Sequence, residues 1–320
     1  MKVLFVHSGN SKRYPVSPFL QAQADSLRAE GVVVEFFPVV GKGFGYLRNV
    51  KPLREAIRSI RPDVVHAHYV LCGWVAVLAR EKIPLVLSLM GDDAQGTFTG
   101  RDRRTWSSWL FITLTRLIQP FVHAIIYKSR DLGKVVWRDR IGHLLPNGVR
   151  MEQFRVDPDG AGRELGFDRS KKHVLFLGDP SDPNKNFALV RDAVGSLGRD
   201  DVELHTPYGT DHDTVVKLMN GADVLTLCSF GEGSPNVIKE AMACGCPIVS
   251  VPAGDAQWVI GETEGCHITG YEPRDFASGL QRALAFKGRT RGRERIISLG
   301  LDATSTARKL ITIYQRASRN

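Results

Sequence analysis

Cysteine is scarce in this sequence, and its spacing argues against a disulfide-bonded or zinc-binding protein. Five cysteines occur among the 320 residues. Their number is odd, and Cys244 and Cys246 form a C-x-C pair rather than the C-x-x-C pair of many metal and redox sites. We therefore predict that the cysteines are small buried side chains in a reducing compartment, and that the protein holds no metal.

Long apolar runs are also missing. No segment reaches the roughly 18 apolar residues that a membrane-spanning helix needs. The most apolar candidate, residues 106–118, is interrupted by Arg116 and carries two serines and two threonines. The start of the chain, MKVLFVHSGN, lacks the apolar core and small-residue cleavage site of a secretory signal. These absences predict a cytoplasmic protein.

Charge is unevenly distributed along the chain. The 43 basic and 34 acidic residues give a net charge of +9. Through Arg155 there are 23 basic and 12 acidic residues, a balance of +11, whereas the remainder has 20 and 22, a balance of −2. A basic half can face nucleic acid, an anionic membrane or an acidic substrate. No nucleic-acid recognition module is visible, so we expect no nucleic-acid partner.

The apolar pattern predicts two successive alternations of strands and helices. Strands are expected at residues 2–6, 32–40, 63–68, 84–89, 124–127 and 144–149, and then at 173–177, 202–205, 224–228 and 247–251. Helices are expected at residues 18–30, 50–60, 73–80, 104–119, 187–197, 212–220, 235–244, 273–284 and 304–316. Two such runs predict an α/β protein with two Rossmann-like, doubly wound domains, at 1–155 and 156–300, joined near a polar linker at 157–172.

One segment of the second half, FGEGSPNVIKEAMACGCPIVSV at residues 230–251, carries most of the chemical information. Ser234 is a good N-cap and Pro235 suits the first helical position, so a helix should begin there. The free N–H groups at such an end bind anions, most commonly phosphate. Glu232 lies just before this end, and Glu240 within the helix could accept two hydrogen bonds from a ribose diol. Taken singly, each acid could also be a solvated or capping residue.

The spacing of Glu232 and Glu240 resembles the E-x7-E signature of retaining family-four glycosyltransferases. Three further blocks resemble that family in the same order: residues 62–68 (PDVVHAH), 146–149 (PNGV) and the helix at 304–316. The resemblance implies the GT-B fold, in which two Rossmann-like domains face across a cleft. Domain 1–155 would bind the acceptor, domain 156–300 the nucleotide-sugar, and residues 301–320 would cross back to the first domain.

The resemblance also implies roles at the donor site. Glu240 would hold the nucleotide ribose, and Glu232 would contact the donor sugar hydroxyls. Lys185 matches the family's diphosphate lysine, with a surface lysine as the alternative. The remaining donor-site residues would be Gly178, Gly233, Ser234, Pro235 and Asn236. A fixed ammonium and a helix end can stabilise the leaving diphosphate without a metal. The nucleotide-sugar is then a substrate, and no cofactor is expected.

Two departures from the family pattern affect this assignment. The family usually has Gly-Arg where this chain has Gly178-Asp179, so one diphosphate cation is missing. Met90 replaces a histidine after the strand at 84–89, which leaves only its backbone carbonyl to act beside the reacting sugar. Asp92 and Asp93 are expected to bind the acceptor or the sugar, with turn and helix-cap chemistry as the alternative.

Several residues near strand ends of the first domain are acceptor-side candidates. Gly9, His68 and Asp93 are assigned there, and His7 and His66 are possible helpers that could equally be structural. In this family the leaving phosphate helps to deprotonate the acceptor, so no strong general base is required.

The implied activity is transfer of a hexose from a UDP-sugar, preferred over a GDP-sugar, to a glycan or lipid-linked acceptor. The stretch at residues 179–186 most resembles enzymes of cell-surface polysaccharide assembly of the teichuronic acid type. Alternatives are a sugar-nucleotide epimerase, a phosphorylase, or a non-catalytic sugar- or lipid-binding subunit. Basic residues at 101–104 and 128–140 flank the Trp-rich helix, which suits peripheral attachment to the inner face of an anionic membrane. The alternative is a helix docked on the core with solvated ends.

Overall fold

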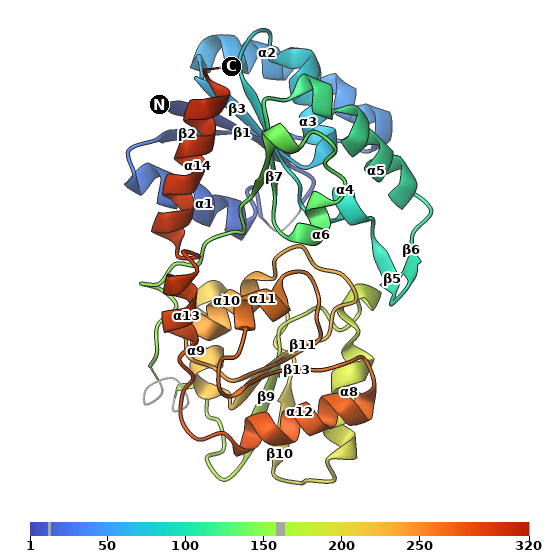
Figure 1. The fold of residues 1–320 in the computed structure, drawn as a ribbon, viewed down its shortest axis with the longest axis vertical. Coiled ribbons are helices and arrows are strands. Elements are labelled where there is room, and N and C mark those ends of the chain that lie inside the picture. Colours follow the sequence, from blue (N-terminus) through green and yellow to red (C-terminus); the bar gives the residue numbers. More distant parts are fainter. Residues whose placement is uncertain (12–13, 158–163, 320) are drawn as a thin grey trace. The chain divides into compact units, whose positions relative to one another are not determined.

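The computed structural model describes residues 1–11, 14–157 and 164–319, and the chain forms two compact units (Figure 1). The first unit contains Met1–Thr97, Thr105–Gly148 and Ala303–Asn320, and the second contains Phe98–Arg104 and Val149–Asp302. The chain passes from one unit to the other at residues 97/98, 104/105, 148/149 and 302/303, whereas the sequence suggested domain boundaries at 155/156 and 300/301. Residues 158–163 of the expected linker lie outside the described residues.

The first unit is built on a six-stranded parallel sheet in the order β2-β1-β3-β4-β7-β8. Its strands are β1 (Lys2–Ser8), β2 (Val33–Val39), β3 (Val64–His68), β4 (Leu85–Ser88), β7 (Ala124–Tyr127) and β8 (Gly142–Leu144). The helices are α1 (Pro18–Ala29), α2 (Val50–Ile60), α3 (Val70–Ala79), α4 (Asp92–Gln95), α5 (Ser108–Leu117), α6 (Arg130–Gly133) and α14 (Ala303–Ala317). Short 3-10 helices are η1 (Gly43–Asn49), η2 (Gln119–Phe121) and η3 (Asp139–Ile141).

Both faces of this sheet are buried, as a doubly wound fold requires. Successive side chains of a strand point to opposite faces. Leu4 and Val6 accordingly join a core cluster with side chains of α2 and α3. Val3 and Phe5 join a second cluster with side chains of α1 and α14. This two-sided burial explains why β1 is an apolar run in the sequence rather than an alternating pattern.

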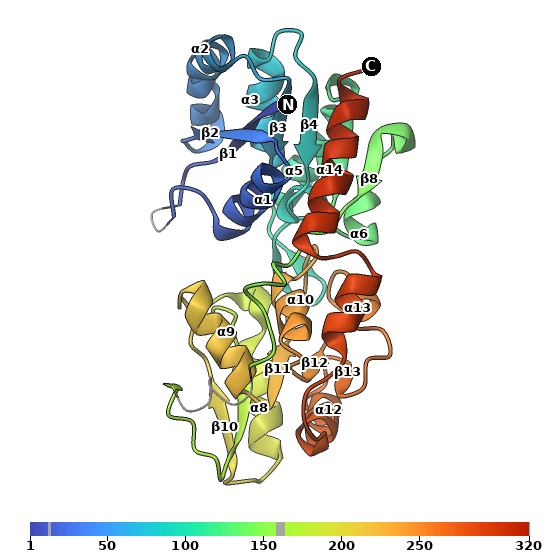
Figure 2. The same cartoon turned by 90° about the vertical axis from the view of Figure 1, so that its left-hand side faces the viewer.

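The last helix returns to the first unit after the chain has completed the second. The sequence predicted a helix at 304–316, and α14 spans Ala303–Ala317 against α1 (Figure 2). Tyr314 is fully buried, and its hydroxyl lies 2.6 Å from His66 Nδ1 in β3. Arg308 pairs with Glu30 just beyond α1, with Nε 2.8 Å from Oε2. These contacts make α14 an integral part of the first unit.

The second unit has a five-stranded parallel sheet in the order β10-β9-β11-β12-β13. Its strands are β9 (Lys172–Phe176), β10 (Val202–His205), β11 (Val224–Leu227), β12 (Ile248–Ser250) and β13 (Cys266–Ile268). Its helices are α8 (Phe187–Ser196), α9 (His212–Gly221), α10 (Asn236–Ala243), α11 (Ala256–Ile260), α12 (Pro273–Ala285) and α13 (Gly292–Ser298), with the 3-10 turn η4 (Pro183–Lys185). A single apolar core cluster runs through the unit.

Several elements differ from the sequence prediction. The helix expected at 104–119 begins only at Ser108, because Arg103 and Arg104 form strand β6, paired antiparallel with β5 (Phe98–Gly100). The strand expected at 144–149 is β8, which ends at Leu144. β13, α11 and α13 were not predicted because each spans at most seven residues, too few for a clear period.

The cysteines are free thiols, and four of the five are buried. This agrees with the prediction of small buried side chains. Within the described part of the chain, no helix has both the length and the apolar character to cross a bilayer.

Candidate functional site

A pocket of about 350 Å³ lies in the second unit, where the chain leaves β9 and β11. These neighbouring strands are parallel, so their carboxyl ends share one edge of the sheet, the usual ligand position in such folds. Residues that line it include five expected at the donor site: Gly178, Lys185, Glu232, Pro235 and Asn236. Gly233, Ser234 and Glu240 are not among its described lining residues.

Lys185 and Glu232 form an ion pair in this pocket. Nζ of Lys185 lies 2.6 Å from Oε1 of Glu232, with side chains 29% and 17% exposed. Lys185 ends η4, whereas Glu232 lies in the loop between β11 and α10. Among the described residues that line the pocket, Lys185 is the one with a cationic side chain, so the positive side-chain charge of the pocket lies at this single residue.

Hydrogen bonds of Asn184 link the two loops that carry this ion pair. Its side-chain Nδ2 donates to the carbonyl of Gly231, and its Oδ1 accepts from the N–H of Gly231, both at 3.0 Å. The N–H of Phe230 also donates to the Asn184 carbonyl at 2.9 Å. The neighbouring Asp182 caps η4 by accepting from the N–H of Asn184. The loop residues on either side of the pocket are therefore held in register by backbone-directed hydrogen bonds.

The start of α10 is one residue later than the sequence suggests. Pro235, with φ −64° and ψ 115°, is the N-cap, and the helix begins at Asn236. The Ser234 hydroxyl does not cap the helix, and it accepts a hydrogen bond of 2.9 Å from Lys239 Nζ. Asn236 and Val237 line the pocket, so the positive end of the α10 dipole faces it.

Two ionisable groups of α10 have strongly perturbed proton affinities. Burial raises the pKa of Glu240 to about 7, while the charges of Lys239 and Arg150 act in the opposite direction. Burial lowers the pKa of Lys239 to about 8, opposed by the carboxylates of Asp255 and Glu240. Perturbed groups of this kind cluster at functional sites, although structural charge networks also produce them. With this raised pKa, Glu240 changes its charge near neutral pH.

Asp179 occupies the position at which the related family carries arginine. Its Oδ1 accepts from the N–H and the hydroxyl of Ser181, at 2.8 and 2.7 Å. These hydrogen bonds lower the pKa of Asp179, so it adds negative rather than positive charge to the pocket lining. Gly178 before it is required sterically, since a Cβ there would lie 2.9 Å from the Phe176 ring and 3.3 Å from Lys185 Cβ.

The β5–β6 hairpin packs against the Glu232 loop within the second unit. A side chain at Gly231 would overlap the ring of Phe98, which shows how closely β5 approaches the loop. The Arg101 guanidinium lies 5.1 Å from the Tyr271 ring centroid, and Tyr271 stacks on Phe230 of the same loop. In the basic stretch 101–104, which the sequence suggested as a flank of the Trp-rich helix, Arg101 thus contacts an aromatic ring that stacks on this loop.

Ser229 supplies an unsatisfied polar group to the pocket. It is 1% exposed, and its hydroxyl has no hydrogen-bond partner among the described residues. A buried hydroxyl without a partner is energetically costly. Because Ser229 lines the pocket, a bound polar ligand could supply the missing hydrogen bond.

Asp93 of the first unit organises the loop after β4. It is fully buried, and its Oδ1 accepts from the N–H groups of Met90 and Gly91, at 2.8 and 3.0 Å. Its Oδ2 accepts from the N–H of Val70 at 3.1 Å. Burial raises the pKa of Asp93 to about 6 against these hydrogen bonds. This geometry supports the turn-and-cap interpretation of Asp93, whereas Asp92 is exposed and accepts from Thr97 Oγ1 at 3.1 Å.

Three histidines gather at β1 and β3 of the same unit. His66 is structural, since its ring nitrogens lie 2.6 Å from the Tyr314 hydroxyl and 2.8 Å from Ser88 Oγ. Nε2 of His7 and Nε2 of His68 have no hydrogen-bond partner among the described residues, although both rings are buried. Burial lowers the pKa of His68 well below its usual value, so its ring is neutral. Gly9, just beyond β1, is required because a Cβ there would lie 2.7 Å from Pro38 Cβ.

Sequence reasoning missed three contributors to the pocket and its surroundings: Asn184, Ser229 and Phe98. Asn184 lies within the stretch 179–186 that was recognised as informative, but its role depends on contacts with a loop about 45 residues away in the chain, whereas Ser229 falls between the expected strand 224–228 and the block 230–251. The short β-strand that carries Phe98 has no period of its own. The sequence did contain one indication of the contact with Phe98. Gly231, beside Glu232, has no side chain, as is typical where another part of the backbone or a ligand comes close.

Two family models match the chain. The model of the Glycosyl transferase 4-like domain matches residues 6–141, and the model of Glycosyl transferases group 1 matches residues 167–285. Each match lies largely within one of the two structural units.

Similar proteins support the same placement. The D-inositol 3-phosphate glycosyltransferase of Streptosporangium roseum is 25% identical over 332 aligned positions, which cover 88% of this chain and 75% of that protein. The putative teichuronic acid biosynthesis glycosyltransferase TuaC of Bacillus subtilis is 22% identical over 234 positions, covering 64% of this chain and 57% of that protein. This chain covers 64% and 61% of the length of two further D-inositol 3-phosphate glycosyltransferases.

Solved structures agree in fold. The sucrose-phosphate synthase of Thermosynechococcus elongatus superposes with a TM-score of 0.79 at 17% identity, over 98% of both chains. Anabaena HepE in complex with UDP superposes with a TM-score of 0.71 at 17% identity, over 98% of this chain and 100% of that chain. The chain therefore belongs to the group 1, GT4-like family of glycosyltransferases and has their GT-B fold.

Proposed function

We propose that this protein transfers a hexose from a UDP-sugar to a glycan or lipid-linked acceptor, with retention of the anomeric configuration, in cell-surface polysaccharide synthesis. The observation that carries the proposal is the Lys185–Glu232 pair beside the start of α10, in a pocket at the carboxyl ends of β9 and β11. This arrangement places an ammonium, a carboxylate and a helix N-terminus around one small volume.

Each group has a distinct role in the proposed reaction. When the sugar leaves, negative charge builds on the diphosphate, and Lys185 and the amino end of α10 stabilise it. Glu232 accepts hydrogen bonds from the sugar hydroxyls, which a carboxylate does without donating any. Glu240 accepts from the ribose diol on the same helix. Backbone groups of Gly178, Gly233, Ser234, Pro235 and Asn236 complete the donor site, with no metal or cofactor in the scheme.

Retention requires that the acceptor attack the face that the diphosphate leaves. The leaving phosphate then takes the acceptor proton, so the enzyme needs no strong base. We assign Met90, through its carbonyl, and Asp92 to the reacting sugar and acceptor. Gly9, His68 and Asp93 complete the acceptor side, with Asp93 acting through the loop that it holds. The neutral ring of His68, with its unpartnered Nε2, is suited to hydrogen-bond an uncharged hydroxyl.

The donor and acceptor classes rest on the similar proteins and on the surface. HepE was solved with UDP, and TuaC is described as acting in teichuronic acid biosynthesis. Trp106, just before α5, and Trp109, in its first turn, are 92% and 73% exposed and present large apolar side chains to solvent. Apolar side chains beside basic residues suit the surface of an anionic membrane, where a lipid-linked acceptor would be found.

A nucleotide panel tests the donor assignment. UDP should raise the melting temperature of the wild-type protein more than GDP or ADP does, since a ligand that binds only the folded state stabilises it. Glu240→Ala should abolish the shift, and Glu262→Ala, a change outside the pocket lining, should retain it. Absence of stabilisation by any nucleotide would refute the donor site.

A product assay tests the reaction itself. With a UDP-sugar and a membrane extract as the acceptor source, the new glycosidic bond should keep the donor's anomeric configuration by NMR. Hydrolysis or epimerisation of the UDP-sugar in the absence of acceptor would support the epimerase alternative instead.

A further inference from the structure

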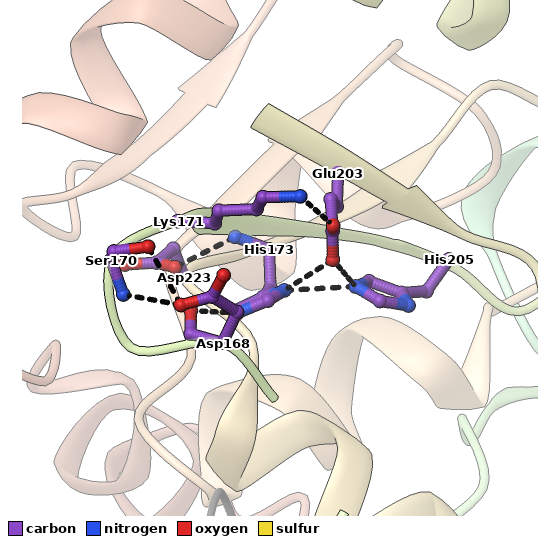
Figure 3. A network of polar contacts seen from close by, with 7 residues as sticks. All are labelled: Asp168, Ser170, Lys171, His173, Glu203, His205 and Asp223. Atoms are coloured by element: carbon purple, nitrogen blue, oxygen red, sulfur yellow. Dashed lines mark hydrogen bonds and ion pairs between the residues drawn. The ribbon is translucent and has the colours of Figure 1, made fainter. Parts of the chain in front are cut away.

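Two histidines and a glutamate from neighbouring strands meet at one edge of the second sheet. His173 lies in β9, and Glu203 and His205 lie in the edge strand β10 (Figure 3). The parallel register pairs His173 with Glu203. Paired residues share a face, and residues two apart on a strand share a face, so the three side chains project on the same side. The sequence alone cannot reveal this group, because His205 lies in a different strand, which begins at Val202, 29 positions after His173.

The three ligand atoms have the spacing of a tetrahedral metal site. His173 Nδ1 lies 2.9 Å from His205 Nε2 and 3.7 Å from Glu203 Oε2, and His205 Nε2 lies 3.9 Å from Glu203 Oε2. Ligands bound to Zn²⁺ at its usual bond lengths in tetrahedral geometry lie about 3.3 Å apart. The observed separations lie on both sides of this value, and all candidate ligand atoms lie within 4.8 Å of one another.

The surrounding groups orient the ligand atoms toward a common point. His173 Nε2 lies 2.9 Å from the Asp168 carbonyl, and a carbonyl only accepts, so Nε2 carries the proton and Nδ1 keeps its lone pair. Without a metal, this lone pair accepts the hydrogen bond from His205 Nε2, and the His205 proton must move to Nδ1 of the same ring when a metal binds at Nε2. Metal-binding histidines are typically fixed in this way through their other ring nitrogen. The ring of Phe167 stacks on both imidazoles, with centroids 4.3 and 4.5 Å away. Glu203 Oε1 is held by Lys171, which leaves Oε2 directed at the histidines.

The local charge is compatible with a cation. Figure 3 shows three carboxylates, those of Asp168, Glu203 and Asp223, with the ammonium of Lys171. Lys172 adds a second ammonium, paired with Asp223 at 2.8 Å. The histidines are neutral as metal ligands, so the group carries one net negative charge before an ion binds.

We propose that His173 Nδ1, Glu203 Oε2 and His205 Nε2 bind a divalent cation of the zinc class, with water in the fourth position. Two imidazoles and one carboxylate suit Zn²⁺, Cu²⁺ or Ni²⁺ and not Mg²⁺, which prefers oxygen ligands. The side chains of Glu203 and His205 are 37% and 25% exposed, which leaves room for a water ligand and a path of entry. None of the three residues lines the donor pocket, and the proposed transfer chemistry does not use this ion. Its effect would be to tie the edge strand β10 to β9.

A metal titration tests the proposal. Protein without an affinity tag, treated with chelator and dialysed, should bind one equivalent of Zn²⁺ in competition with a chromophoric chelator. His205→Ala and Glu203→Gln should each weaken binding at least tenfold, in the range found when metal ligation is perturbed. His267→Ala is the matched control, because His267 lies on β13, the opposite edge strand of the same sheet. It should bind Zn²⁺ as the wild type does.

Two further measurements keep the test decisive. Zn²⁺ should raise the melting temperature of wild type and of His267→Ala but not of His205→Ala, and Mg²⁺ should raise none of them. Co²⁺ should give the visible absorption of a tetrahedral site in wild type only if the site forms. The proposal is overturned if wild type binds no stoichiometric Zn²⁺, or if folded His205→Ala and Glu203→Gln bind it as tightly as wild type.

Discussion

Lys185 and Glu232, which we assign to the diphosphate and to the sugar of the donor, form an ion pair with each other in this structure, with 2.6 Å between Nζ and Oε1. A diphosphate would compete with Glu232 for the ammonium, and the sugar hydroxyls would compete with Lys185 for the carboxylate. The pair therefore keeps both charges satisfied before the donor binds, at a partly exposed site where such a pair contributes little to stability. Its two members should have separable effects on binding and on transfer.

Removing the ammonium should damage both donor binding and transfer. Lys185→Ala is expected to weaken UDP binding at least tenfold and to lower kcat by roughly 10²–10³-fold, the usual effect of losing one group that stabilises transition-state charge. Isothermal titration and initial rates measure the two effects. Lys217→Ala is the control, since Lys217 pairs with Glu164 away from the pocket lining. Unchanged UDP affinity in Lys185→Ala would contradict the diphosphate role.

Neutralising the carboxylate should separate binding from catalysis. In Glu232→Gln, the carboxylate charge that competes with the diphosphate for Lys185 is removed. UDP, which lacks the sugar, should bind as well as in wild type or better, while transfer falls by roughly 10²-fold because an acceptor of sugar hydroxyl protons is lost. The same two assays decide it. Parallel losses of UDP affinity and of kcat would place Glu232 at the nucleotide instead of the sugar.

The sequence predicted much of the fold because the parallel strands are buried on both faces and read as apolar runs. Such runs located β1, β3, β9 and β11 to within two residues at each end. The N-cap of α10 was misplaced by one residue, because local preferences favour Ser234 at a position that Pro235 occupies. The hydrogen bond from the buried Lys239 ammonium to the Ser234 hydroxyl is likewise not visible in those local preferences.

Contacts between distant segments were beyond reach of the sequence pattern. Asp93 and Asp92 are neighbours with similar local preferences, yet Asp93 is fully buried and accepts a hydrogen bond from the N–H of Val70, which lies in another element. Asn184 and Gly231 also meet only through contacts between distant segments. His173 and His205 are brought together only by the register of β9 and β10. Of these residues, Asp92 and Asp93 were recognised as candidates from the sequence, and their partners required the structure.

The pKa of Glu240 predicts a pH dependence of donor binding. Burial raises this pKa to about 7, so the carboxylate form, which accepts hydrogen bonds from the ribose diol, becomes dominant as pH rises through that value. Affinity for a UDP-sugar should therefore increase between about pH 6 and 8 and level off above. A UDP-sugar is preferable to UDP because its diphosphate has no terminal phosphate that titrates near pH 6.

The stability effect of Glu240 has the opposite sign. Its pKa is higher in the folded than in the unfolded protein, so the folded form holds more protons, and its contribution to stability is lost as pH rises through about 7. Glu240→Gln should flatten both profiles in titrations of binding and of unfolding. A wild-type binding profile that stays flat from pH 6 to 8 would count against a ribose role for this carboxylate.

The side chain of Asn184 should matter for the order of the pocket. Asn184→Ala removes two hydrogen bonds to Gly231 and leaves a backbone N–H and carbonyl without them. The expected cost is about 1–3 kcal/mol in the free energy of unfolding, measured with urea, together with weaker UDP binding. Ser181→Ala, on the exposed side of the same loop, should change stability by less than about 0.5 kcal/mol. An Asn184→Ala protein with wild-type stability and UDP affinity would show that the loops do not depend on this link.

Gly231 and Phe98 should show a compensating pair of substitutions. Gly231→Ala places a methyl group where the Phe98 ring lies, so either the hairpin or the Glu232 loop must move, and the displacement of Glu232 should lower transfer activity. Phe98→Ala alone should lose only the packing of one ring, whose neighbours include the guanidinium of Arg104 at 4.9 Å from its centroid.

In the double substitution Gly231→Ala/Phe98→Ala, the methyl group has space, and activity should recover to the level of Phe98→Ala. Rates for the four proteins form a double-mutant cycle, in which contact between the two sites requires a coupling energy of about 0.5–3 kcal/mol. Additive effects would show that β5 does not pack on this loop in solution.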